Sequence, residues 1–293
     1  MISLNNTLIK ELSLLPEGAK IMIIGEADTG KSTVVTALAR WFRNQSHKVA
    51  VVDSDMGQSD IGPPGFISYG IVERDIASLQ SITNNGSYLI GKTSPYGREL
   101  SMVTGTKVCT EAAGHQGADT ILIDTCGLVK SLKGIQLKCA KAEIIKPDLI
   151  LALKTPGIAP LVNRLNLLGF HVRSFLPSQK VRTKPAKERK ENRISGLNTY
   201  MGVGPSLLDV LHSRTAIRRW WDENRYIDID QIPHGTVAAI RNPTSSEFQI
   251  PCIWTISEDK PFILAPLPRD YKLDTIWISA YKLELNGNTV VSA

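Results

Sequence analysis

One stretch decides the fold of this 293-residue chain: Gly25-Glu26-Ala27-Asp28-Thr29-Gly30-Lys31-Ser32. It fits the pattern G-x-x-x-x-G-K-[ST], which is typical of loops that bind the phosphates of a nucleotide. The apolar run Lys20–Ile24 precedes it and predicts a buried strand, and apolar residues at helical spacing follow it from Ser32 to Phe42. Such a loop points backbone N–H groups and a helix N-terminus at phosphate. A chance match in a glycine-containing turn would not explain the flanking strand and helix.

Within this loop, two side chains have expected roles. Lys31 would reach the β- and γ-phosphates, and Ser32 would hold Mg²⁺. The expected nucleotide-binding residues are Gly25, Glu26, Ala27, Asp28, Thr29, Gly30, Lys31, Ser32 and Thr33.

The composition is that of a folded protein with a modest positive charge. Hydrophobic residues make up 42% of the chain, and 34 basic against 28 acidic residues give a formal charge of +6, which is compatible with a polyanionic partner. No apolar run reaches the roughly 18 residues of a membrane helix, and the N-terminus lacks the features of a signal peptide. The four cysteines form no C-x-x-C pair, so we expect reduced thiols and a cytoplasmic location.

From Lys20 onward, short apolar runs alternate with segments of helical periodicity. This alternation predicts an α/β fold of the P-loop NTPase type, in which helices cover both faces of a parallel sheet and ligands bind at the carboxyl ends of the strands. The predicted strands are Lys20–Ile24, Lys48–Asp53, Tyr88–Ile90, Thr120–Asp124, Leu149–Leu153 and His171–Leu176, and the predicted helices are Lys31–Asn44, Leu100–His115, Ile135–Lys146 and Pro160–Leu168.

The composition changes twice in the C-terminal part of the chain. Residues 179–193 hold seven basic and two acidic residues, a local charge of +5. From about Asp228, short β-type runs separated by Pro, Asn, Gly and Asp predict a small all-β unit. We therefore expect a P-loop domain over residues 1–227, with a basic segment at 179–196, and a small β domain over residues 228–293.

Two predicted strands end in acidic residues beside the phosphate-binding loop. The second strand runs into Asp53-Ser54-Asp55-Met56-Gly57-Gln58, where a carboxylate suits either general-base work on a hydroxyl or Mg²⁺ binding. Another apolar strand ends at Asp124, and an aspartate downstream of a P-loop orients Mg²⁺. The alternative for Asp53 and Asp55 is a strand that ends in solvated acids and a turn, and for Asp124 an apolar run followed by an aspartate is by itself a common pattern. We expect the metal to be held by Ser32, Asp53 and Asp124.

The basic segment, a cysteine and two tryptophans leave alternatives open. The charge run is either a solvated helix or a lid that brings positive charge to a transferring phosphoryl group and excludes water. Trp220 and Trp221 either stack on bases or anchor a helix in the core. For Cys126 we expect a small buried thiol, because no histidine is placed to activate it.

Four blocks of the sequence together resemble one family. They are the phosphate-binding loop, Asp53–Gln58 with the following Pro63-Pro64-Gly65-Phe66-Ile67-Ser68, Gly91-Lys92-Thr93-Ser94-Pro95, and Ile123-Asp124-Thr125-Cys126-Gly127. In order and spacing they are similar to the polynucleotide 5′-hydroxyl kinases of RNA processing, which include the cleavage-factor kinase subunit and the ribosomal-RNA-processing kinases. The resemblance covers about residues 20–202 and is weaker over the β tail, where the family also has a small β domain.

The resemblance implies ATP- and Mg²⁺-dependent phosphorylation of a 5′-OH end, usually of RNA. It implies that Asp55 takes the proton of the 5′-OH, with Lys31 on the triphosphate and Arg182 as the first arginine of a lid. A second lid arginine falls where this sequence offers Lys187, Arg189 and Arg193, and our catalytic candidates are therefore Asp55, Lys31, Arg182, Arg189 and Arg193.

The expected polynucleotide groove includes two departures from the family. Gln58, Thr93 and Ser94 would line it. Leu128 stands where the family often has a tryptophan that is proposed to stack on the terminal base, and Arg98 stands where an asparagine is common. The departures concern base contacts and hence the preference between RNA and DNA.

The sequence therefore predicts a polynucleotide 5′-hydroxyl kinase that uses ATP or another NTP. Three alternatives stay open: a P-loop switch or assembly ATPase that binds RNA-processing partners without phosphoryl transfer to nucleic acid, a non-catalytic scaffold that keeps its nucleotide, and a kinase of small metabolites. ATP hydrolysis that ignores nucleic-acid ends would favour the switch. The basic segment favours a longer polyanion over a small metabolite, because phosphate contacts dominate such binding.

Overall fold

The phosphate-binding loop follows a strand of the larger sheet. The structure is a computed structural model that describes residues 6–177, 182–202, 204–211, 215–220, 227–283, 285–286 and 289–290. In this part of the chain, the sheet has seven strands in the order β4-β3-β2-β5-β1-β6-β7. Their bounds are β1 Ala19–Ile24, β2 Val49–Ser54, β3 Phe66–Ile71, β4 Gly86–Leu89, β5 Thr120–Thr125, β6 Leu149–Leu153 and β7 Val172–Phe175.

Five neighbouring strands of this sheet run parallel, as predicted. They are β2, β5, β1, β6 and β7, whereas β3 is antiparallel to both β2 and β4. We did not predict β3, because Ser68 and Gly70 interrupt its apolar run. Both residues fit their places: the Ser68 and Ser87 hydroxyls lie 2.9 Å apart in a hydrogen bond, and a Cβ at Gly70 would lie 2.2 Å from Thr83 O.

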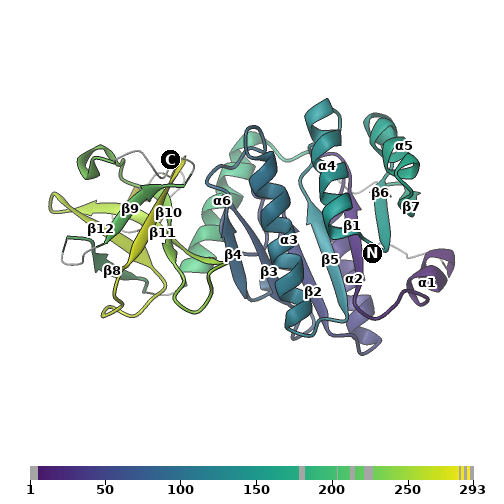
Figure 1. The fold of residues 1–293 in the computed structure, drawn as a ribbon, viewed down its shortest axis with the longest axis horizontal. Coiled ribbons are helices and arrows are strands. Elements are labelled where there is room, and N and C mark those ends of the chain that lie inside the picture. Colours follow the sequence, from purple (N-terminus) through teal and green to yellow (C-terminus); the bar gives the residue numbers. More distant parts are fainter. Residues whose placement is uncertain are drawn as a thin grey trace.

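Helices cover both faces of the sheet, as expected (Figure 1). Ile21 and Ile23 of β1 pack with α2 (Lys31–Asn44), and α1 (Asn6–Leu12) adds Leu12 to this core. Met22 and Ile24 point to the other face, where they pack with α4 (Leu132–Ile145) and α5 (Ala159–Leu167). Helix α3 (Glu99–His115) covers the same face over β2 and β3. Short 3₁₀ turns are Leu79–Ser81, Pro156–Ile158 and Ile229–Gln231.

A second, six-stranded sheet in the described residues confirms the predicted C-terminal β domain. Its order is β8-β12-β11-β10-β13-β9. Strands β8 and β9 precede residue 228, where we expected the domain to begin, and they join its sheet by pairing with β12 and β13. The bounds are β8 Ser206–Asp209, β9 Ala216–Arg219, β10 Thr236–Arg241, β11 Gln249–Ser257, β12 Lys260–Ala265 and β13 Thr275–Lys282, followed by a ribbon of β14 Leu285–Asn286 and β15 Thr289–Val290.

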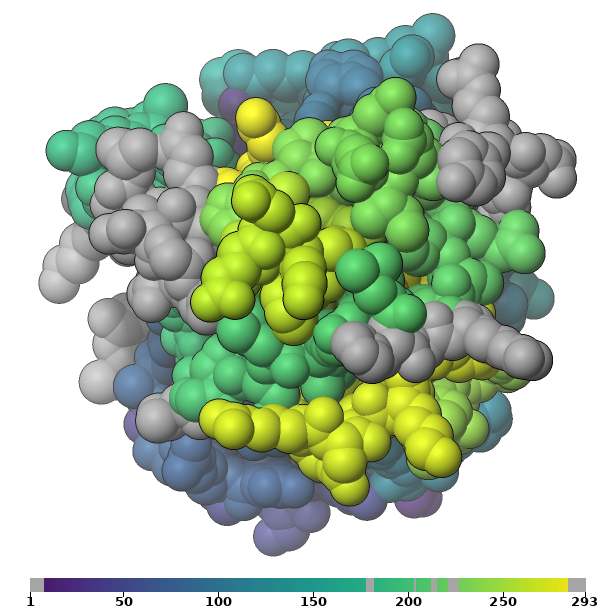
Figure 2. Space-filling view, turned by 90° about the vertical axis from the view of Figure 1, so that its left-hand side faces the viewer, coloured from purple at the N-terminus to yellow at the C-terminus, as the bar shows by residue number. Residues whose placement is uncertain are grey.

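Helix α6 (Ala186–Met201) lies between the two sheets (Figure 1). Its Ile194 and Leu197 pack with Leu89 of the first sheet and with strands of the second. Figure 2 looks onto this end of the molecule and shows the yellow and green segments of the second domain over the centre of the face. The basic segment is therefore in part a helix with a buried apolar side. No described helix is both long and apolar enough to cross a membrane.

Trp220 lies in the packed junction of the two domains. Its ring meets those of Tyr88 and Trp277 edge to face, with centroids 5.9 Å and 5.8 Å apart. These contacts favour the core-anchor alternative for Trp220, but the residue directly follows strand β9, so the expected helix at this position is wrong. Trp221 lies outside the described residues.

Candidate active site

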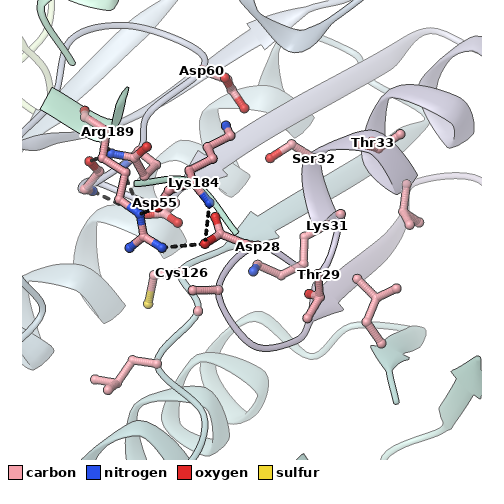
Figure 3. A pocket seen from close by; sticks show the side chains of 18 of the residues that line it. Asp28, Thr29, Lys31, Ser32, Thr33, Asp55, Asp60, Cys126, Lys184 and Arg189 are labelled. Atoms are coloured by element: carbon pink, nitrogen blue, oxygen red, sulfur yellow. Dashed lines mark hydrogen bonds and ion pairs between the residues drawn. The ribbon is translucent and has the colours of Figure 1, made fainter. Parts of the chain in front are cut away.

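The phosphate-binding loop joins the carboxyl end of β1 to the first turn of α2 (Figure 3). Gly30, immediately before α2, has a φ of 90°, and Asp28 has a φ of 56°. A Cβ at Gly25 would lie 2.8 Å from Thr29 Oγ1, so this position requires glycine. The loop therefore turns tightly enough to place its backbone around an anion.

Lys31 is held within this loop. Its Nζ donates a hydrogen bond of 2.7 Å to Glu26 O, which also accepts one of 2.8 Å from Thr29 Oγ1. Lys31 is 7% exposed, and burial lowers its pKa while the charge of Asp124 acts to raise it. The side chain thus lies at the loop that would surround a phosphate chain, with a backbone oxygen as its present partner.

Ser32 and Asp124 form a pair that could hold a metal. Ser32 Oγ donates to Asp124 Oδ2 at 2.6 Å. Burial raises the pKa of Asp124 to about 7, with Lys31 acting to lower it. Asp124 Oδ1 is buried and accepts no hydrogen bond. A buried carboxylate oxygen with no donor, beside a serine hydroxyl, suits a cation that prefers oxygen ligands.

A cation here would need further ligands from a bound phosphate or water. Among the described residues, no three His, Cys, Asp or Glu side chains gather as a metal-binding group. Mg²⁺ commonly takes one or two protein ligands and completes its shell with substrate phosphates and water. The pair of Ser32 and Asp124 fits that pattern.

Asp53, near the end of β2, and Asp55, just after it, have different surroundings. Both oxygens of Asp53, which is 1% exposed, accept backbone hydrogen bonds: Oδ1 from Asp55 N at 3.0 Å and Oδ2 from Ile61 N at 2.9 Å. Asp55 Oδ1 accepts from Gly57 N at 3.1 Å and Gln58 N at 3.2 Å. Asp53 therefore holds the loop that follows β2, and Asp55 lies on the part of that loop that borders the cavity.

A cavity of about 960 Å³ joins the predicted regions (Figure 3). The predicted residues in its lining are Ala27, Asp28, Thr29, Gly30, Lys31, Ser32, Thr33, Asp55, Gln58, Thr93, Leu128, Arg182, Arg189 and Arg193. The predicted residues that do not line it are Gly25, Glu26, Asp53, Ser94, Arg98 and Asp124. Glu26 shapes the loop through its backbone oxygen, and Asp124 is connected to the cavity lining by its hydrogen bond from Ser32.

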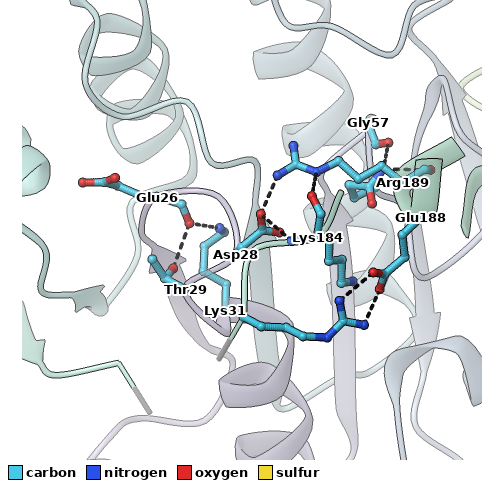
Figure 4. Close-up of polar contacts among 10 residues, drawn as sticks. Glu26, Asp28, Thr29, Lys31, Gly57, Lys184, Glu188 and Arg189 are labelled. Carbon is cyan, nitrogen blue, oxygen red and sulfur yellow. Dashed lines mark hydrogen bonds and ion pairs between the residues drawn. The ribbon is translucent and has the colours of Figure 1, made fainter. Parts of the chain in front are cut away.

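Cations of the basic segment face the phosphate-binding loop across the cavity (Figure 4). Arg189 Nη2 pairs with Asp28 Oδ2, and Lys184 N donates to the same oxygen at 3.2 Å. Arg182 forms two hydrogen bonds with Glu188, of 2.7 Å and 3.0 Å. The described part of the expected lid thus lies at the site, while residues 179–181 lie outside the described residues.

The side of the cavity next to Asp55 is formed by two loops in contact. A Cβ at Gly57 would lie 2.7 Å from Thr93 O, so the loop after β2 packs directly on the loop after β4. Gln58 Nε2 donates to Gly57 O at 2.8 Å and to Arg189 O at 3.3 Å. Leu128 also lines the cavity.

The profile described as mRNA cleavage and polyadenylation factor CLP1 P-loop matches residues 25–202, more than half of the chain. The chain belongs to this CLP1 P-loop family. Among its relatives, the polyribonucleotide 5′-hydroxyl-kinases of Pyrococcus horikoshii and Thermococcus kodakarensis are both 36% identical to it, over 63% and 61% of this chain. Each alignment covers 50% of the relative, so the chain spans about half the length of the curated relatives it matches.

A more distant relative and a solved structure extend the comparison. The Protein CLP1 homolog of Nematostella vectensis is 30% identical over 46% of this chain and 34% of its own length. A chain in the solved wild-type Clp1p–Pcf11p complex is 12% identical and superposes with a TM-score of 0.73, over 94% of this chain and 77% of that one. The structural likeness confirms the fold, and the profile confirms the family that the four sequence blocks resemble.

In this member of the CLP1 P-loop family, sequence reasoning missed Asp60 and Lys184, which also line the cavity. Burial raises the pKa of Asp60, and the charge of Lys184 acts in the opposite direction. Asp60 is the third aspartate within residues 53–60, and this clustering of acidic residues was the available signal in the sequence.

Two buried lysines behind the site were missed as well. Lys138 and Lys141 of α4 have no exposed surface; Lys138 Nζ donates to Cys126 Sγ at 3.1 Å, and Lys141 Nζ donates to Ser54 Oγ. Burial acts to raise the pKa of Cys126, but the charges of Lys138 and Lys141, with a backbone hydrogen bond at Leu128, act in the opposite direction and the pKa is lowered. Cys126 is a buried thiol, as expected, yet it lines the cavity. Lysines three apart on an otherwise apolar helix face were the available signal.

Proposed function

We propose that this chain is a polynucleotide 5′-hydroxyl kinase that transfers the γ-phosphate of ATP or another NTP to the 5′-OH end of RNA or DNA. One observation carries the proposal: a single cavity holds the phosphate-binding loop, the Asp55 carboxylate and the cations Arg182, Arg189 and Arg193. A nucleotide-dependent switch requires the loop but no carboxylate for an acceptor. Membership of a family whose relatives are named polyribonucleotide 5′-hydroxyl-kinases supports the same reaction.

Both substrates would bind in this cavity. The triphosphate would lie along residues 25–33, and its nucleoside would lie at the apolar end formed by Val34, Leu153 and Phe175. The 5′ end of the polynucleotide would enter beside Asp55, where Gln58, Thr93 and Leu128 line the cavity. We expect a protein that meets such substrates in the cytoplasm.

Mg²⁺ would be held by Ser32 and Asp124, whose buried oxygen accepts no hydrogen bond. Bound there, it would neutralise the negative charge of the phosphate oxygens. We assign Asp53 to holding the loop after β2 rather than to the metal, because both of its oxygens accept hydrogen bonds from that loop.

Asp55 would act as the general base. Its carboxylate would accept the proton of the 5′-OH as the new O–P bond forms and the bond from the γ-phosphorus to the β-phosphate oxygen breaks. Lys31 and the lid arginines would stabilise the charge on the transferring group. Arg182 could reach it only by leaving Glu188, with which it forms an exposed ion pair of the kind that contributes little stability.

A phosphate-transfer assay with labelled ATP tests the proposal. Oligonucleotides of RNA and DNA with a 5′-OH, as single strands, duplexes and overhangs, should gain one label per 5′ end in the presence of Mg²⁺. The same oligonucleotides with a 5′-phosphate should gain none. Tight ATP binding without transfer to any of them would refute the proposal, and ATP hydrolysis that ignores the ends would point to the switch ATPase.

A further inference from the structure

Three cations at the cavity already have partners within the chain. Lys31 donates to Glu26 O at 2.7 Å, Arg182 bonds twice to Glu188, and Arg189 pairs with Asp28 (Figure 4). The first partner is a backbone oxygen and the second belongs to the basic segment itself. Only the third of these contacts joins the basic segment to the phosphate-binding loop.

Asp28 occupies a position that brings its carboxylate to α6. Its backbone has a φ of 56°, a left-handed conformation that aspartate tolerates better than most residues. Its side chain is 12% exposed, and that of Arg189 is 34% exposed. Lys184 N donates to Asp28 Oδ2 at 3.2 Å, and Arg189 Nε donates to Lys184 O at 3.2 Å. Asp28, Lys184 and Arg189 therefore form a closed set of contacts that fixes the guanidinium above the loop.

The backbone of Arg189 contacts a second loop of the cavity lining. Gln58 Nε2, from the loop that contains Asp55, donates to Arg189 O at 3.3 Å. One residue of α6 thus contacts the donor-binding loop through its side chain and the acceptor side through its backbone. A change of partner at the guanidinium leaves this backbone contact in place.

A phosphate chain on the loop changes the preference of Arg189. Guanidinium groups bind phosphate oxygens in two-pronged fashion and more strongly than a single carboxylate oxygen in a partly exposed pair. The same phosphates repel the carboxylate of Asp28, because both are negative and both lie at the loop. Asp28 and the phosphates consequently compete for one arginine.

We propose that Asp28 is a positioning residue that holds Arg189 at the phosphate-binding loop and releases it to the bound phosphates. This inference depends on the proposed function for the identity of the donor only, since any polyphosphate on the loop would replace Asp28. The arginine is then in place before the donor arrives, and it changes partner without a large movement of α6.

Binding of Mg²⁺-tripolyphosphate to two variants gives the test, measured by isothermal titration calorimetry and by the shift in Tm. Asp28→Asn removes the competitor, so tripolyphosphate should bind severalfold more tightly than to the wild type. Arg189→Gln removes the shared partner, so tripolyphosphate should bind at least about tenfold more weakly. Weaker binding by Asp28→Asn would show that Asp28 supports the anion, and it would overturn the proposal.

A double-mutant cycle on Tm separates the exchange of partners from a lasting contact. Asp28→Asn and Arg189→Gln should be coupled in the free protein and uncoupled with saturating tripolyphosphate. Coupling that persists with tripolyphosphate, or is absent from the free protein, would refute the exchange. The exposed pair of Arg40 and Asp75 is the matched control: its cycle with Arg40→Gln and Asp75→Asn should be unchanged by tripolyphosphate.

An adenosine control and the Arg189→Gln variant alone keep the test decisive if Asp28→Asn does not fold or the chain has no kinase activity. Adenosine, which has no phosphate, should leave the coupling of Asp28 and Arg189 unchanged. If Asp28→Asn does not fold, Arg189→Gln still decides, because exchange requires both a lower Tm of the free protein and a smaller shift with tripolyphosphate. No kinase activity is measured, so a chain that fails the transfer assay would refute the proposed function and leave this inference standing.

Discussion

At the scale of single residues, the proposed chemistry depends on Asp55. Its Oδ1 accepts hydrogen bonds from Gly57 N and Gln58 N. Asparagine retains an oxygen for both bonds but cannot accept the proton of a hydroxyl. Asp55→Asn should therefore keep the loop and the affinity for ATP while kcat falls by about 10²–10⁴-fold in the transfer assay.

Asp274→Asn is the control for this substitution. Asp274 forms an exposed pair with Arg241 in the second domain, so its variant should turn over like the wild type. If Asp55→Asn also turned over normally, the general base would have to be another group.

Lys141 makes stability depend on pH in a direction that follows from its burial. Burial lowers its pKa from 10.5 to about 7 in the folded chain. Between these values the unfolded chain binds more protons than the folded chain, so this group raises the free energy of unfolding as the pH rises from about 7 to 10.5 and removes that gain as the pH falls back. Lys141→Met should abolish this slope because it removes the titrating amine. Ser54 Oγ keeps a partner in the variant, since it also forms a hydrogen bond of 2.6 Å with Thr106 Oγ1.

Urea unfolding at several pH values measures the effect. Lys141→Met should be at least as stable as the wild type at pH 7. As the pH rises, the free energy of unfolding of the wild type should increase relative to that of the variant. Lys107→Met removes an exposed ammonium and should give a curve parallel to that of the wild type. A parallel curve for Lys141→Met would mean that Lys141 is not held with a lowered pKa.

Residues that belong to motifs could be placed from the sequence, and residues that reach the site from elsewhere could not. Lys31 was predicted from the glycine pattern of the loop and Asp55 from its place at a strand end, and both line the cavity. Lys141 reaches Ser54 from 87 positions along the chain, and only the packing of α4 on the sheet creates that contact. No local pattern encodes it.

At the scale of elements, the loop after β5 supports the phosphate-binding loop through a glycine. A Cβ at Gly127 would lie 2.4 Å from Ala27 N and 2.5 Å from Ala27 Cα. These are backbone atoms, so the clash can be relieved only by moving the backbone of one of the two loops. Gly127→Ala should displace the phosphate-binding loop and weaken ATP binding at least about tenfold, the equivalent of a cost near 1.4 kcal/mol.

Calorimetric titration with ATP measures this loss. Gly114→Ala in α3 is the matched control, because its Cβ would meet nothing closer than Ile121 Cδ1 at 3.9 Å and alanine suits a helix better than glycine. Wild-type affinity in Gly127→Ala would show that the two loops can separate without consequence.

Elements with a clear period were predicted and those without one were not. β1, α2 and β5 follow their apolar patterns to within a residue or two at each end. β3 was not predicted because Ser68 and Gly70 interrupt its apolar pattern; Ser68 pairs with Ser87 of β4, and Gly70 packs against Thr83 in the segment before β4. α6 was left between two interpretations, since its buried Ile194 and Leu197 stand among charged residues.

At the scale of the whole molecule, the two domains share one packed junction. Leu89 N of β4 donates a hydrogen bond of 2.8 Å to Gln249 Oε1, which lies on β11 and is 6% exposed as a residue. Gln249→Ala would leave that buried N–H without an acceptor, at a cost of about 1–3 kcal/mol in the free energy of unfolding. Urea unfolding should show this loss.

Gln231→Ala is the control for the junction. Gln231 is exposed in the same domain, and within the described part of the chain its side chain bonds to Asp228, so its loss should change stability by less than about 0.5 kcal/mol. Equal stability of the two variants would mean that the junction does not hold the domains together.

The extent of the second domain was the least predictable feature. Residues 206–209 and 216–219 resemble neither a strong strand nor a strong helix by pattern, and they become strands by pairing with β12 and β13 from far along the chain. A boundary placed at residue 228 from composition alone therefore separates β8 and β9 from the other four strands of the second sheet.

The most direct measurement is a structure of the protein with Mg²⁺, a non-hydrolysable ATP analogue and a 5′-OH oligonucleotide. We predict the 5′ oxygen within about 2.6–3.2 Å of an Asp55 carboxylate oxygen, with the γ-phosphate on the loop of residues 25–32. An oligonucleotide whose 5′ end lies away from Asp55 while the analogue occupies that loop would contradict the account.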